Sequence, residues 1–109
     1  MPNKREPPPI PDPLPAGVID AHTHLDACGA RTAADVVAMV DRAEAAGVER
    51  VVTVADDMDS ARWVVEASTW DSRVYAAVAL HPTRTGDFDD ARRAELAELA
   101  SADRVVAVG

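Results

Sequence analysis

Short apolar runs alternate along this chain with longer segments in which apolar side chains recur at every third or fourth position. The runs are rich in β-branched residues, which is typical of parallel strands covered on both faces. The longer segments have the spacing of amphipathic helices. We predict strands at 18–26, 48–55, 74–80 and 104–109, and helices between Thr32 and Gly47, at about 60–70 and at 88–101. This alternation indicates right-handed βαβ units and a parallel α/β sheet, and periodicity alone is compatible with a barrel or an open sheet.

Side-chain chemistry marks the ends of the predicted helices. Thr32 with an acid three residues later resembles a capping box and starts the first helix. Gly47 suits the end of that helix, because glycine tolerates the backbone conformation of a helix C-terminus. Asp56, Asp57 and Asp59 follow the second strand, where they could bind a cation. We favour capping of the next helix for these acids, because carboxylates stabilise helix N-termini.

Residues 1–16 differ in composition from the rest of the chain, since they hold seven of its eight prolines. Proline fixes its own backbone and lacks an N–H donor, so such a segment favours extended polyproline II structure. A solvated flexible arm is the favoured interpretation, ahead of a ligand for a proline-binding module. We therefore predict an arm at 1–16 and one globular domain at 17–109.

Composition narrows the function classes. The 109 residues fit one soluble domain at most. The formal net charge is −8, and the sequence lacks the basic patch that a nonspecific nucleic-acid binder normally has. A single cysteine, Cys28, excludes an internal disulfide and is interpreted as a free side chain. No run has the length of a membrane span or the pattern of a signal peptide, so a cytoplasmic location without membrane contact is expected.

Two histidines one residue apart, His22 and His24, stand at the end of the first predicted strand. Because strand side chains alternate between faces, both imidazoles project from the same side. Imidazole is the commonest protein ligand of metal ions, and Asp20 and Asp26 flank the pair. We predict a metal site here, against the alternative of two exposed or hydrogen-bonded histidines without an ion. His81 also follows a strand, ahead of a predicted loop at 83–87, and is a further candidate site residue.

The order of these motifs resembles the TatD family of metal-dependent deoxyribonucleases. The motifs are Val-Ile-Asp-Ala-His-Thr-His-Leu-Asp at 18–26, Ala-Gly-Val before the second strand, Leu-His-Pro after the third and Val-Val-Ala-Val-Gly at 105–109. The resemblance implies the first half of an amidohydrolase-like (β/α) TIM barrel, about four strands and three helices, ending in strand four. Ala79 stands where the family often has glycine. The family's next ligand, a glutamate after Val-Gly, would follow Gly109.

The same resemblance implies a function for the candidate residues. His22 and His24 match the family's first metal-ligand pair, and His81 matches a histidine that contacts the substrate phosphate. The implied cofactors are one or two divalent ions (Zn, Mg or Mn) that activate water for hydrolysis of phosphodiester bonds in DNA. We expect the chain alone to be an incomplete, inactive fragment that can self-associate. Open alternatives are an amidohydrolase acting on C–N bonds, a PHP-type phosphoesterase, and a non-catalytic fragment that binds through its proline arm.

Overall fold

The computed structural model describes residues 6–109, and it contains four strands that alternate with helices. All neighbouring strands are parallel, in the order β1-β2-β3-β4. The elements are β1 (Val18–Thr23), α1 (Ala33–Ala45), β2 (Val48–Val54), α2 (Met58–Ala67), β3 (Val74–Val78), the 3-10 helix η1 (Pro82–Asp87), α3 (Asp90–Ala100) and β4 (Val105–Val108). The predicted parallel α/β fold is confirmed, and it is consistent with the first half of a TIM barrel.

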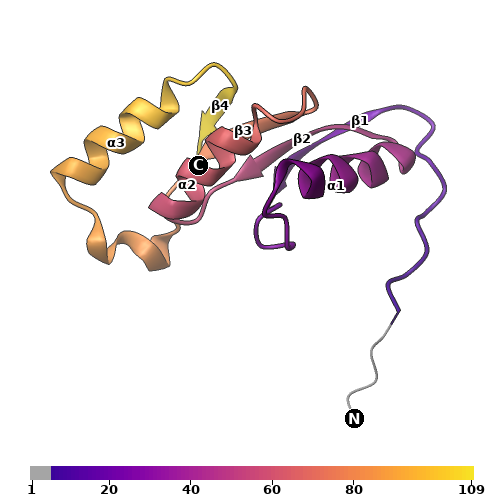
Figure 1. The fold of residues 1–109 in the computed structure, drawn as a ribbon, viewed down its shortest axis with the longest axis horizontal. Coiled ribbons are helices and arrows are strands. Elements are labelled where there is room, and N and C mark those ends of the chain that lie inside the picture. Colours follow the sequence, from indigo (N-terminus) through magenta and orange to yellow (C-terminus); the bar gives the residue numbers. More distant parts are fainter. Residues whose placement is uncertain (1–5) are drawn as a thin grey trace, which may run out of the picture.

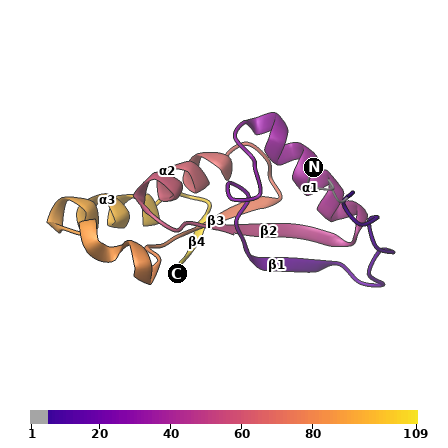
Figure 2. The same cartoon turned by 90° about the horizontal axis from the view of Figure 1, so that it is seen from below.

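The helices pack on one side of the sheet (Figures 1 and 2). Val36 and Val40 of α1 pack with Val51 and Val74 in one buried cluster. In a second cluster, side chains of α2 pack on β2 and β3, and α3 adds partly buried leucines: Ala61, Val64, Val54, Ala76, Val78, Leu96 and Leu99. Burial of these apolar surfaces is what holds the helices to the sheet.

The other side of the sheet keeps apolar side chains in contact with solvent. On the two edge strands, Ile19 is 57% exposed, and Val106 and Val108 are 56% and 66% exposed. Figure 2 shows β1 and β2 with the helices above them and their lower side uncovered. In a closed (β/α) barrel this side of the strands lines the packed interior.

The caps predicted for α1 are confirmed. The backbone N–H of Asp35 donates to Thr32 Oγ1 (3.2 Å), and the backbone N–H of Thr32 donates to the Asp35 carboxylate (3.1 Å). Backbone N–H groups of Arg31 and Thr32 lower the pKa of Asp35, because they stabilise its charged form. Gly47, with φ of 93°, ends the α1 segment in a conformation that favours glycine.

The predicted starts of the other two helices are wrong by two residues. α2 begins at Met58, because the Asp57 carboxylate accepts the N–H of the third helical residue (2.8 Å), and it ends at Ala67, before the predicted end at residue 70. α3 begins at Asp90, because Asp89 caps it in the same way (2.9 Å). Both helices therefore begin directly after a capping aspartate, as the preference of carboxylates for helix N-termini requires.

Two other predicted segments also differ from the structure. The predicted loop at 83–87 is part of η1, whose single-turn bonds include Thr85 Oγ1 donating to the Pro82 carbonyl (3.2 Å). The first strand ends at Thr23 instead of reaching residue 26, since tight turns follow it. His24 consequently lies just beyond the strand end.

Arg73 ties the end of α1 to the segment that enters β3. Its guanidinium pairs with Asp41 (2.8 Å) and Glu44 of α1 and with Asp71 (2.8 Å). This hydrogen bonding lowers the pKa of Asp71, so its stabilising contribution is present at neutral pH and is lost as the pH falls through the lowered pKa. The network fixes α1 at the end of the sheet that lies away from the histidines.

Residues 6–16 form neither helix nor strand and are exposed, and the predicted arm's first five residues lie outside the described part of the chain. Its one backbone–backbone hydrogen bond with the domain among the described residues is Leu14 N–H donating to the Ala46 carbonyl (3.2 Å). Within residues 6–109, every helix is too short or too polar to cross a membrane.

Candidate metal centre

The carboxyl ends of parallel strands meet at one edge of a sheet, and the candidate residues lie at this edge. His22 is within β1 near its end, and His24 follows that strand. Asp56 follows β2, and His81 follows β3. This edge carries the functional residues of (β/α) barrels and of open α/β sheets alike.

His22 and His24 lie side by side. Their ring centroids are 5.0 Å apart with an interplanar angle of 76°. His22 is exposed, whereas the His24 side chain is 31% exposed. Asp20 supports the strand end, since its carboxylate accepts the backbone N–H of His22 (3.1 Å). The structure therefore brings together the two residues that the sequence placed on one face.

The hydrogen bond made by His24 determines which ring nitrogen is available to a ligand. Its Nδ1 lies 2.7 Å from the carbonyl oxygen of Val54. A carbonyl can only accept, so Nδ1 carries the proton and the lone pair of the neutral ring is on Nε2. Metal-binding histidines commonly donate their second nitrogen to a carbonyl in this way, which fixes the ring orientation. The His24 ring thus fits a metal ion.

A carboxylate also lies beside this ring. Asp56 Oδ1 is 3.8 Å from His24 Nδ1. The backbone N–H of Asp56 donates to Ser60 Oγ (2.6 Å), so the first turn of α2 fixes the position of Asp56. Of the three acids after β2, Asp57 is the helix cap, as predicted, and Asp56 is the residue whose place beside His24 the sequence interpretation missed.

Buried Thr53 is a second residue that the sequence interpretation missed. Its hydroxyl accepts the backbone N–H of Leu25 (3.2 Å), which anchors the turn that follows the histidine pair to β2. A threonine in the apolar second half of β2 is the signal that the sequence offers. Asp26, predicted to flank the metal site, has a buried Oδ1 without a hydrogen-bond partner among the described residues.

The donor set at this edge is that of a partial coordination shell. Within residues 6–109, no group of three or more histidine, cysteine, aspartate and glutamate side chains is arranged to hold a metal ion. The rings of His22 and His24 are therefore two nitrogen donors that one ion could share. A protein metal site normally needs three or four such ligands.

His81 has a different environment. It is the N-cap of η1, where its Nδ1 accepts the backbone N–H of Thr83 (3.2 Å) and lies 2.8 Å from Thr83 Oγ1. An amide N–H can only donate, so the neutral His81 ring carries its proton on Nε2. The Nε2 atom of this ring therefore offers a hydrogen-bond donor instead of a metal-binding lone pair. No described hydrogen bond or ion pair joins His81 to the histidine pair; its backbone N–H donates to the Asp56 carbonyl (2.7 Å).

Comparison with known proteins gives three matches. The family model described as "TatD related DNase" matches residues 19–109. "Uncharacterized metal-dependent hydrolase TatD" of Mycobacterium tuberculosis (strain ATCC 25618 / H37Rv) is 66% identical over 92 residues, which are 84% of this chain and 35% of that protein. "Uncharacterized metal-dependent hydrolase YabD" of Bacillus subtilis (strain 168) is 33% identical over 92 residues, which are again 84% of this chain and 35% of that protein. The chain thus spans about a third of the length of these curated relatives.

Proposed function

Because this chain belongs to the TatD family of metal-dependent hydrolases, we propose that it supplies the first two ligands of a divalent metal site that hydrolyses phosphodiester bonds in DNA. One observation carries this proposal: two imidazoles lie 5.0 Å apart at a strand end, and the fixed ring of His24 offers its Nε2 lone pair. The names of both relatives include "metal-dependent hydrolase", which supports the same class of chemistry. The activity proposed is that of the complete domain, of which this chain is the matched part.

The chemistry needs both a metal and the residues that hold it. A bound divalent ion polarises phosphoryl oxygens and lowers the pKa of its water from about 15.7 towards about 7. His22 and His24 would hold that ion through ring nitrogens, and the Val54 carbonyl would keep the His24 ring oriented. Two imidazoles leave an ion mostly hydrated, so the remaining ligands belong to the part of the domain beyond the matched segment.

His81 is proposed to contact the substrate phosphate. Its Nε2–H points away from the Thr83 contacts that fix the ring, so it can donate to an anionic oxygen. A donor fixed before the substrate arrives stabilises charge that develops on the phosphoryl oxygens, without reorganisation during the reaction. This role differs from metal binding, which requires the lone pair of a ring nitrogen.

A chimera with the Mycobacterium tuberculosis relative tests this function. In it, this chain replaces the 92-residue segment that the two proteins share. We expect hydrolysis of single-stranded DNA in the presence of Mn²⁺ or Mg²⁺. His81→Ala is expected to lower turnover by about 10²-fold, which is typical for loss of one donor to a developing anion, with metal content unchanged. Initial rates and metal analysis of the purified chimeras measure both quantities.

His81→Gln is the matched variant, because the glutamine amide keeps a side-chain N–H donor. It should retain more turnover than His81→Ala. Loss of bound metal from His81→Ala would show that this histidine is a ligand, which would remove the proposed phosphate contact. A metal-loaded chimera that leaves DNA intact and cleaves an amide substrate would contradict the phosphodiester part of the proposal.

A further inference from the structure

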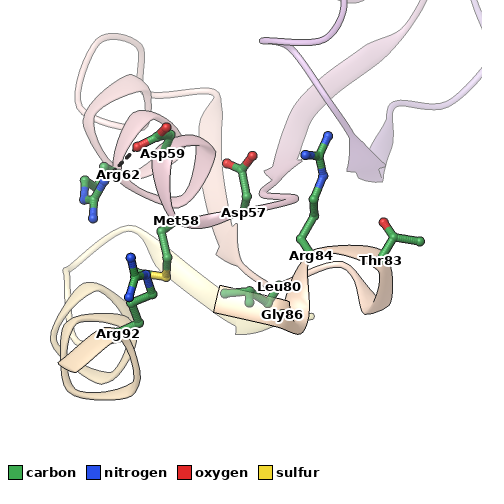
Figure 3. Close-up of a pocket in the computed structure, with 9 residues that line it drawn as sticks. All are labelled: Asp57, Met58, Asp59, Arg62, Leu80, Thr83, Arg84, Gly86 and Arg92. Carbon is green, nitrogen blue, oxygen red and sulfur yellow. Dashed lines mark hydrogen bonds and ion pairs between the residues drawn. The ribbon is translucent and has the colours of Figure 1, made fainter. Parts of the chain in front are cut away.

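A hollow of about 400 Å³ lies between the first turn of α2, η1 and α3 (Figure 3). Three arginines line it, one from each of these elements: Arg62, Arg84 and Arg92. Two aspartates line it as well: Asp57 caps α2, and Asp59 is paired with Arg62. None of the three histidines lines it, so it is separate from the candidate metal centre. Since α2 and η1 follow β2 and β3 directly, the hollow lies at the same carboxyl edge of the sheet as the histidines.

Arg62 has a structural role in the wall of this hollow. Its Nε and Nη2 donate to the two carboxylate oxygens of Glu95 (2.7 and 2.6 Å), and its Nη1 donates to Asp59 (2.8 Å). These bonds raise the pKa of Arg62, because both carboxylates favour its charged form. Arg62 therefore joins α2 to α3 and has little capacity left for a ligand.

The other two arginines keep donors for a ligand. Arg92 uses Nη1 for Asp89 of its own helix turn (2.8 Å), and its remaining N–H groups have no partner among the described side chains. Arg84 makes no hydrogen bond or ion pair through its guanidinium with any described side chain. Figure 3 shows Arg84 extending from η1 along the hollow, with its guanidinium on the same side as the Asp57 carboxylate.

An anion is the ligand that this arrangement favours. A guanidinium presents a planar fork of donors that matches the oxygens of a phosphate, and charge-assisted bonds of this kind are strong. The chain as a whole carries a formal charge of −8, so anions approach it favourably only where cations gather. Met58 and Leu80 line the same hollow and add apolar surface beside the arginines, which suits a nucleotide with its charged phosphate and flat base.

We infer that this hollow binds a phosphate of a single-stranded oligonucleotide, with Arg84 as the main contact and Arg92 as the second. The choice of a nucleotide phosphate rests on the proposed function. The binding itself needs no metal, because none of the proposed ligands lines the hollow. Arg84 is accordingly a substrate-binding residue, and metal loading does not depend on it.

Titration of the 109-residue chain with hexathymidylate in EDTA tests this site. We expect ¹⁵N amide shifts at residues 83–86 and at Arg92 on binding. The affinity of Arg84→Ala should be about tenfold to a hundredfold weaker, the range for loss of hydrogen bonds to a charged group. Arg84→Lys keeps the charge but loses the planar fork of donors. Its affinity should lie between that of the original chain and that of Arg84→Ala. Arg84 is exposed, so Arg84→Ala is expected to keep the far-UV circular dichroism of the original chain.

Arg50→Ala is the matched control, because Arg50 is exposed near the start of β2, at the opposite edge, and its loss changes the net charge equally. Its affinity should stay within about twofold of the original. Equal weakening in both variants, or no binding by the original chain, would overturn the site. Inorganic phosphate should bind more weakly than the oligonucleotide. Equal affinities would contradict the proposal that an oligonucleotide is the ligand. EDTA removes divalent ions, so this titration does not involve the proposed metal site. A negative result therefore does not contradict the histidine proposal, and an inactive chimera does not contradict the binding site proposed for this hollow.

Discussion

Replacing Leu25 with alanine is expected to lower the free energy of unfolding by about 2–5 kcal/mol, the range for truncating a buried leucine. Leu25 is 6% exposed and packs in the cluster that joins α1 to β2 and β3. The turn that it occupies follows the histidine pair, and its backbone N–H donates to buried Thr53. Truncation leaves a cavity between this turn and the helix, which the surrounding backbone can close only in part.

Urea unfolding followed by far-UV circular dichroism and by tryptophan fluorescence measures this effect. Trp63 and Trp70 are suitable reporters, because they pack against the same cluster and form an edge-to-face pair with centroids 5.8 Å apart. Coincident transitions from the two probes would validate the two-state treatment. Val106→Ala is the control, since Val106 is 56% exposed and its truncation should change stability by no more than about 0.5 kcal/mol. Equal losses in both variants would contradict the burial of Leu25.

The His22→Ala, His24→Ala double variant is expected to bind Zn²⁺ or Mn²⁺ at least about a hundredfold more weakly than the original in the chimera described above. Removal of a residue that only orients a metal ligand already costs about tenfold to a hundredfold, so loss of two ligands should cost more. The rings are close enough to share one ion, since their centroids are 5.0 Å apart. Hydrolysis should disappear with the metal, and calorimetry measures the affinity directly.

His81→Ala is the control for this double variant, because it also removes an imidazole from the carboxyl edge of the sheet. It should leave metal affinity unchanged, since the His81 ring is bonded to Thr83 through Nδ1 and offers a proton on Nε2. Unchanged calorimetry in the double variant would contradict the assignment of His22 and His24. Equal losses in the two variants would show that all three histidines act together.

The features that the sequence predicted well depend on short-range rules. Strand periodicity placed His22 and His24 on one face, and the structure brings their rings together. The capping box of Thr32 and the glycine end at Gly47 follow from backbone hydrogen bonding within a few residues. The parallel sheet follows from the alternation of apolar runs and amphipathic segments. Each of these rules involves neighbours along the chain, so a single sequence contains the necessary information.

The features that the sequence did not predict involve partners far apart along the chain or weak local preferences. The ring orientation of His24 depends on the Val54 carbonyl, thirty residues away, and on the position of Asp56. The tie between Arg62 and Glu95 spans thirty-three residues and shapes the arginine-lined hollow. The 3-10 helix η1 was missed because a Pro-Thr-Arg-Thr-Gly sequence satisfies the usual composition of a loop. Which residues far apart in the chain meet depends on the register of the strands, and the local sequence pattern does not determine that register.

In the proposed function, His22 and His24 bind one divalent ion through ring nitrogens, whereas His81 binds none. Long-range ¹H–¹⁵N NMR of the imidazole side chains, recorded on this chain during titration with Zn²⁺, distinguishes these roles. Before zinc, His24 should carry its proton on Nδ1 and His81 on Nε2, as their hydrogen bonds require. On titration, the Nε2 signal of His24 and a ring nitrogen of His22 should shift together, with His81 unchanged. A shift at His81 with none at the pair, or zinc binding that moves none of the three rings, would contradict the claim.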